Sequence, residues 1–71
     1  MMNEPSAEAV VDARGMRCPW PALRLARAMR AEHMVLLLAD DPQAAREIAA
    51  LAALQDWTVE IESEGCWRVT R

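Results

Sequence analysis

The chain has 71 residues, 54% of them hydrophobic, and a formal net charge of −3 at pH 7. A chain this short is expected to form one small domain, without room for a second core or a deep enclosed active site. It has no apolar run of about 18 residues, so no membrane-spanning helix is predicted. The two cysteines are far apart and His33 is the only histidine, so neither a disulfide framework nor a zinc site is predicted, and no metal or other cofactor is expected.

The basic residues are unevenly distributed along the chain. All eight are arginines, and five of them fall between residues 13 and 31 with no acid among them. A basic region in an acidic protein indicates a protein partner with an acidic surface, rather than non-specific binding to nucleic acid. These five residues are Arg14, Arg17, Arg24, Arg27 and Arg30.

Residues 1–8 are polar and acidic, and we predict that they form a disordered tail ahead of a single domain over residues 9–71. The tail lacks the basic start and the apolar stretch of a secretory signal peptide. Two isolated cysteines are also typical of proteins in reducing compartments. We therefore expect a cytoplasmic location.

The first predicted elements are a short strand over Ala9–Asp12, a turn at Gly15 and a helix that ends near Glu32. Apolar residues at helical spacing are expected to face the core. These residues are Ala22, Leu25, Ala26 and Met29. Arg24, Arg27 and Arg30 form a row on the polar side, which is either an ordinary solvated face or a docking surface.

Two prolines leave two registers open for the start of this helix. Either Cys18 is the N-cap and Pro19 opens the helix, or Trp20 is the N-cap and Pro21 opens it. In both, Cys18 lies at the helix N-terminus, where unpaired N–H groups favour negative charge. Beside Arg17, its thiol is predicted to ionise more easily than that of a free cysteine. Trp20 would either bind a partner or cover the helix end.

Residues 34–39 are apolar without alternation, which predicts a central strand. Two helices cover only one face of a four-stranded sheet, so one set of its side chains is expected to be partly exposed. Such a strip either marks a partner surface or is covered by a terminus or the tryptophans. A second helix is predicted over Pro42–Gln55, with Asp41 as its N-cap.

The last two strands are predicted from alternating sequence. In Thr58–Ser63 the side chains of Val59 and Ile61 are expected to point inward, and a turn of three or four residues at Gly65 leads into the strand Cys66–Arg71. The element order is then βαβαββ. This predicts an α+β fold, a two-layer α/β sandwich in which two helices cover one face of a four-stranded mixed sheet.

The segment between the first strand and the first helix reads Asp12-x-x-Gly15-Met16-Arg17-Cys18-Pro19-x-Pro21. It resembles the signature of the TusA/SirA-like sulfur-carrier family, which is marked by Cys-Pro-x-Pro at the start of the first helix. The resemblance continues through Leu38-Ala39-Asp40-Asp41-Pro42 and covers roughly residues 9 to 71. It implies that Cys18 accepts sulfur and that Pro19 and Pro21 support it. Arg17 matches the same signature, Gly15 is interpreted as the turn residue, and Asp12 as a possible hydrogen-bond anchor for the loop.

A sulfur carrier needs an accessible, partly ionised cysteine without a second thiol close by, and Cys18 is expected to meet these needs. Catalysis by a cysteine–histidine pair is not favoured, because His33 would lie on the order of 20 Å away across the helix. The resemblance implies a cysteine desulfurase or rhodanese-type sulfur donor and a downstream acceptor protein. It connects the chain with tRNA thiolation, molybdenum-cofactor synthesis or general sulfur trafficking, as a carrier rather than a stand-alone enzyme.

Several alternatives stay open at this point. Cys18 could be a small buried hydrophobic residue, and the chain a non-catalytic interaction or regulatory module that uses Trp20, Arg24 and Arg27. RNA binding is disfavoured by the acidic net charge and by the lack of stacking aromatics on the strands, so neither a membrane nor nucleic acid is an expected partner. Cys66 is predicted to point outward, and a disulfide with Cys18 stays possible.

Overall fold

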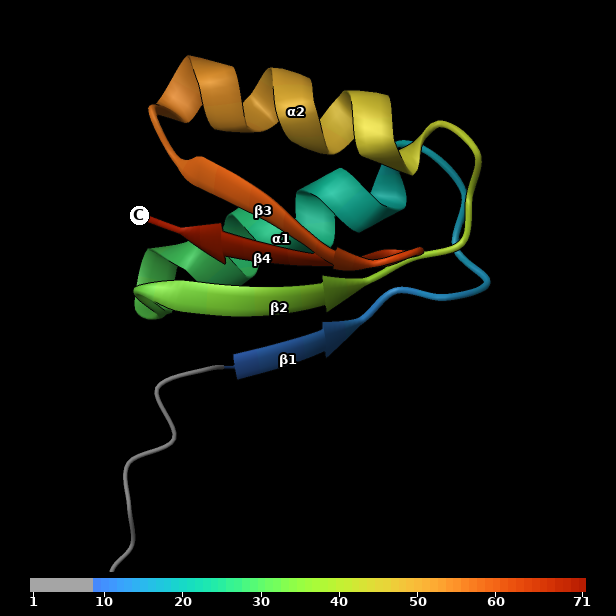
Figure 1. Cartoon of the computed structure of the whole chain (residues 1–71), viewed down its shortest axis with the longest axis horizontal. Coiled ribbons are helices and arrows are strands. Elements are labelled where there is room, and N and C mark those ends of the chain that lie inside the picture. Colours follow the sequence, from blue (N-terminus) through green and yellow to red (C-terminus); the bar gives the residue numbers. More distant parts are fainter. Residues whose placement is uncertain (1–8) are drawn as a thin grey trace, which may run out of the picture.

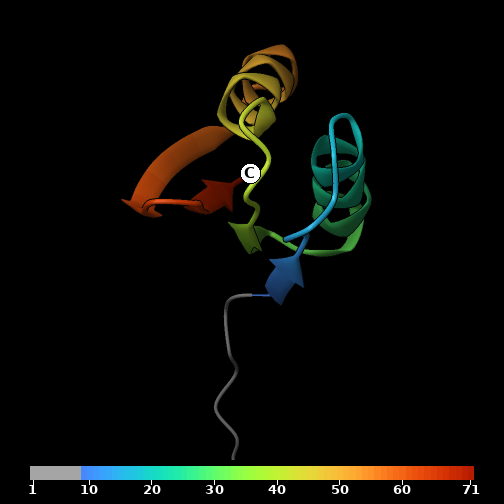
Figure 2. The same cartoon turned by 90° about the vertical axis from the view of Figure 1, so that its right-hand side faces the viewer.

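The computed structural model of the chain describes residues 9–71. Two helices cover one side of a four-stranded sheet (Figures 1 and 2). The elements are β1 (Ala9–Asp12), α1 (Trp20–Ala31), β2 (Met34–Leu38), α2 (Ala44–Gln55), β3 (Thr58–Ser63) and β4 (Cys66–Thr70). The predicted α+β sandwich and its βαβαββ order are therefore confirmed. The predicted disordered tail, residues 1–8, lies outside the described residues.

The sheet is mixed, with the strand order β1-β2-β4-β3. β1 and β2 are parallel, whereas β4 pairs in antiparallel fashion with both β2 and β3. A parallel pair needs a crossover connection, and α1 supplies it. The carboxyl ends of β1 and β2 consequently lie at the same edge of the sheet, which brings the loop after β1 next to the loop after β2.

The core lies between the helices and the sheet. Leu25 and Met29 of α1 and Ile48 of α2 pack against Val35 and Leu37 of β2, and all of these are at most 1% exposed. Burial of each such side chain contributes about 1.5–3 kcal/mol relative to its exposed state. The predicted apolar face of the first helix is confirmed, except that Ala26 is only half-buried. None of the helices in residues 9–71 is long and apolar enough to cross a membrane.

No helix of residues 9–71 covers the other face of the sheet (Figure 2). Val10 is 61% exposed there, and the side chains of Met34, Leu36 and Leu38 are half-buried. This confirms that one set of side chains on the central strand is partly exposed. An ion pair between Arg68 and Glu62, 2.7 Å from Nη1 to Oε2, lies on the C-terminal hairpin.

The prediction that Ile61 points into the core is wrong. Ile61 pairs with Trp67 in the register of β3 and β4, so it is on the helix-covered side, yet it is 75% exposed. The ladder is irregular between Ile61 and Ser63, and the outer end of β3 turns away from α2 (Figure 2). The alternation of apolar and polar residues predicts which side of the sheet Ile61 is on, but not that this end of β3 lies beyond the helix that would bury it.

The second helix begins two residues later than predicted, at Ala44 rather than Pro42. Asp41 still organises its start: its Oδ2 accepts the Gln43 N–H at 2.9 Å and its carbonyl accepts the Ala44 N–H at 2.9 Å. Pro42 and Gln43 therefore form a turn that leads into the helix. Asp41 caps this turn rather than the helix itself, and the helix N-cap is Gln43.

Candidate functional site

Cys18 lies in the loop between β1 and α1, just before the N-cap of the helix. That N-cap is Pro19, so neither predicted register, with Cys18 or with Trp20 as the cap, is correct. The Trp20 N–H donates to the Arg17 carbonyl at 2.8 Å and closes a turn around Cys18 and Pro19, whose peptide bond is cis. Trp20 thus enters the helix, and Pro21 lies in its first turn. Backbone N–H groups in the first turn have no intrahelical acceptor, so the missing N–H of proline costs the helix no hydrogen bond there.

Two sets of hydrogen bonds fix this loop. The Asp12 carboxylate accepts the Arg14 N–H at 3.1 Å and pairs with the Arg14 guanidinium at 2.8 Å. These interactions hold the pKa of the Asp12 carboxyl at about 2, below its ordinary value of 3.8. The Gly15 N–H donates to Asp40 Oδ1 at 2.9 Å, and Gly15 has a φ of +84°. Asp12 thus forms the expected hydrogen bonds within its loop, while Asp40 ties that loop to the one after β2.

The prediction that the Cys18 thiol ionises easily is wrong. The thiol is free and half-buried. Burial raises its pKa above the ordinary value of a cysteine, and the carboxylates of Glu47 and Asp41 raise it further, Glu47 also by hydrogen bonding. Arg17 is not among the groups that shift this pKa. The folded chain therefore keeps Cys18 as a neutral thiol at pH 7.

We expect Glu47→Gln to make Cys18 more reactive in the isolated protein. Removing the carboxylate charge lowers the thiol pKa, so more thiolate is present at any pH below that pKa. Alkylation of Cys18 by iodoacetamide at pH 7 should then be severalfold faster, and its pH profile should move to lower pH. Glu32→Gln, at the far end of α1, is the matched control and should leave the profile unchanged. An unaltered profile for Glu47→Gln would rule out this role of the carboxylate.

The predicted partner-binding residues lie on the outer side of α1. Trp20 is 59% exposed, and Arg24 and Arg27 are exposed as well. The Arg24 guanidinium contacts Met16 Sδ at 3.8 Å. Within residues 9–71, no ion pair involves Arg17, Arg24 or Arg27, so their charges face solvent beside the Cys18 loop.

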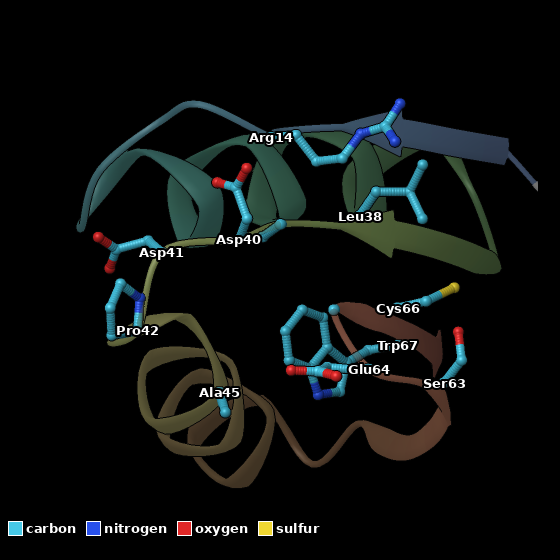
Figure 3. A pocket seen from close by; sticks show the side chains of 12 residues that line it. Arg14, Leu38, Asp40, Asp41, Pro42, Ala45, Ser63, Glu64, Cys66 and Trp67 are labelled. Atoms are coloured by element: carbon cyan, nitrogen blue, oxygen red, sulfur yellow. The ribbon is translucent and has the colours of Figure 1, made fainter.

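A pocket of about 620 Å³ lies at the edge where β2 ends and the hairpin between β3 and β4 turns (Figure 3). Asp40 and Asp41 line it from one side and Glu64 from the hairpin. Cys66 also lines it, but its sulfur points away from the centre (Figure 3). None of the residues predicted for the site lines this pocket. Arg14 of the loop between β1 and α1 does line it, and Asp40 accepts a hydrogen bond from Gly15 of that loop, so the pocket adjoins the Cys18 loop. Both cysteines are free thiols, so the structure contains no disulfide between them.

Three acidic residues act at the site without having been predicted there: Glu47, Asp40 and Asp41, the last of which was predicted only as a helix cap. Glu47, Leu51 and Leu54 share one face of α2 at spacings of four and three, and that spacing was the available signal for Glu47. Asp40 had no comparable local signal, because its partner Gly15 is 25 residues away along the chain. Among the described residues, no group of three or more His, Cys, Asp or Glu side chains could hold a metal ion.

The geometry therefore presents one cysteine in a short loop that enters a helix. Two prolines, hydrogen bonds between Asp12 and Arg14, and one hydrogen bond to the loop after β2 support it. Residues 9–70 match the family model described as Sulfurtransferase TusA. The match extends over nearly all of the described structure, from β1 to the end of β4. The chain thus belongs to the TusA family of sulfurtransferases, whose members carry sulfur in relays from a donor to an acceptor.

Proposed function

We propose that Cys18 accepts sulfane sulfur as a persulfide from a cysteine desulfurase or rhodanese-type donor and passes it to an acceptor protein. The observation that carries this proposal is the position of Cys18, a half-buried free thiol in the loop that leads into α1. It is followed there by Pro19-Trp20-Pro21, in the Cys-Pro-x-Pro order. A thiol in such a loop is open to a partner from outside, which a carrier requires.

In the loading step, Cys18 sulfur attacks the outer sulfur of the donor's persulfide. The donor's S–S bond breaks as the new S–S bond of the Cys18 persulfide forms, and the donor's thiolate leaves and takes up the proton that Cys18 releases. In the second step a thiolate on the acceptor attacks the outer sulfur, and Cys18 leaves in its reduced form. Each step is an exchange between sulfur atoms, so neither needs an external oxidant or reductant.

The neighbouring residues have supporting roles in this proposal. One group shapes the loop: Asp12, Gly15, Arg17, Pro19 and Pro21. A second group, Trp20, Arg24 and Arg27, contacts the partners from the outer side of α1. The exposed aromatic ring of Trp20 and the exposed guanidinium groups of Arg24 and Arg27 are suited to a partner with an apolar spot and an acidic rim.

We place the chain in the cytoplasm, in a relay that serves tRNA thiolation, molybdenum-cofactor synthesis or general sulfur trafficking. It works there as a carrier without a cofactor of its own, and turnover depends on its two protein partners. The alternative, a regulatory module that uses Trp20 and the arginines, differs because it does not require Cys18.

The test is direct loading of the chain. The protein is incubated with a cysteine desulfurase and L-cysteine, or with a rhodanese and thiosulfate, and its intact mass is recorded. We expect a gain of one sulfur atom, about 32 Da, that is removed by dithiothreitol and that peptide mapping assigns to Cys18. Absence of any adduct, or an adduct on Cys66 alone, would contradict the proposal and favour the regulatory alternative.

A further inference from the structure

A groove runs between α1 and α2 and begins beside the Cys18 loop. Its first part has a volume of about 270 Å³, and Pro19, Leu23, Glu47 and Leu54 are among its lining residues. A second hollow of about 280 Å³ lies toward the C-terminal ends of the helices, and Ala26 lines both. The two helices run side by side in the same direction (Figure 1). The groove therefore leads from the Cys18 loop toward the opposite end of the molecule.

The rims of the groove are apolar and exposed. Leu54 of α2 is 80% exposed and Leu23 of α1 is 51% exposed, although both are large aliphatic side chains. Trp20, 59% exposed, is one helical turn before Leu23. A cluster of exposed apolar side chains around a hollow is typical of a surface that binds another protein.

The charges along the groove differ between its two ends. Glu47 lines the end near Cys18, and its carboxylate interacts with the Cys18 thiol. Arg30 and Arg71 line the far hollow. Within residues 9–71 neither of these arginines takes part in an ion pair. A complementary segment would therefore carry a cation at the first end, an apolar side chain in the middle and an acidic group at the far end.

We propose that this groove receives the segment of the sulfur donor that flanks its persulfide cysteine. The donor's cation faces Glu47, its apolar side chain lies between Leu23 and Leu54, and its acidic group pairs with Arg30 and Arg71. This inference rests on the function proposed above.

The loading step favours the donor over the acceptor as the occupant. Only in loading must Cys18 give up a proton, and the Glu47 carboxylate is one of the groups that keep it protonated. A cation of the donor placed next to Glu47 would lower the pKa of the Cys18 thiol again, at the moment when the donor's persulfide sulfur is close enough to react. Docking in the groove would then couple recognition of the donor to activation of the thiol.

The test measures the rate of transfer from the donor that loads Cys18 in the mass experiment, as a function of carrier concentration. Leu54→Ser and the double variant Arg30→Glu/Arg71→Glu should raise KM by about tenfold, because each removes one anchor of the segment, with a smaller change in kcat. KM of the unmodified chain is expected to rise with salt, and this rise should be weaker in the double variant, in which Arg24 and Arg27 are the remaining cations facing the partner. The matched controls are Ile61→Ser, which removes an apolar side chain that is 75% exposed outside the groove, and Arg46→Glu, at an exposed position of α2. Both should stay within about twofold of the unmodified KM.

Glutathione persulfide, a small donor that needs no docking, separates this inference from the function on which it rests. It should load Cys18 at the same rate in all variants, which also shows that their loops are intact. Equal KM values for groove and control variants, with normal loading by glutathione persulfide, would overturn the docking groove and leave the carrier function standing. Failure of both donors to load the unmodified chain would overturn both proposals.

Discussion

Replacing Cys18 by serine is expected to abolish sulfur acceptance from both protein donors and small persulfides. A serine hydroxyl does not ionise near neutral pH and forms no stable bond to sulfane sulfur, so no persulfide can be carried. The change removes little packing, because the side chain is only half-buried in a loop. The variant should therefore keep the thermal stability of the unmodified chain while it shows no sulfur adduct in its mass spectrum.

Cys66→Ser is the matched control for this result. Cys66 is also a half-buried free thiol, but it pairs with Leu38 on β2 and lies at the start of β4. We expect the Cys66→Ser variant to load with sulfur at the normal rate, because the proposed sulfur-accepting residue, Cys18, is unchanged in it. A Cys18→Ser chain that still accepts sulfur, or a Cys66→Ser chain that does not, would contradict the assignment of the reactive residue.

Gly65→Ala is expected to destabilise the fold by about 2–4 kcal/mol, through backbone strain and a steric clash. Gly65 has a φ of +75°, and a Cβ at this position would lie 2.9 Å from the Ala39 carbonyl oxygen. The neighbouring hydrogen bond from the Ala39 N–H to the Gly65 carbonyl, 3.0 Å long, keeps the two backbones close together. The melting temperature should fall by more than about 10 °C, measured by circular dichroism.

Gly15→Ala separates the two causes. Gly15 has a φ of +84°, but no heavy atom lies within 4 Å of the Cβ that the substitution would add. Only the cost of the left-handed backbone then applies, about 1–2 kcal/mol. If the two variants lost equal stability, the close approach of Gly65 to Ala39 would contribute nothing, and the larger prediction would be wrong.

Much of the fold follows from local patterns in the sequence. The alternation in residues 58–63 and the apolar run from Met34 identified strands whose bounds the structure reproduces closely. The turn between the last two strands has Gly65 at positive φ as expected, although it is shorter: Ser63 pairs with Cys66, which leaves only two residues in the loop. These strands and the glycine of the turn depend on neighbours in the sequence, so local patterns predict them.

The properties of the site depended on long-range contacts. The chemistry of Cys18 was predicted from Arg17 and the helix start, both local, whereas its pKa is set by burial and by Glu47 and Asp41. Those acids reach the thiol only because α2 packs beside α1 after the chain has crossed the sheet. The helix starts differ from the prediction for a local reason: turns closed at the Arg17 and Asp41 carbonyl oxygens, each by an N–H three residues later, decide where each helix begins.

The irregularity in β3 affects whether two copies of this protein can pair through the edges of their sheets. β3 forms one outer edge of the sheet, where another chain could in principle add a strand. Its ladder with β4 is irregular between Ile61 and Ser63. Glu60 is exposed on this strand, whereas Glu62 is paired with Arg68. An irregular strand bends, which disfavours continuous pairing with a second molecule at this edge, and the Glu60 side chains of the two molecules would bring like charges together. The same strand that exposes Ile61 therefore protects the protein from edge-to-edge aggregation.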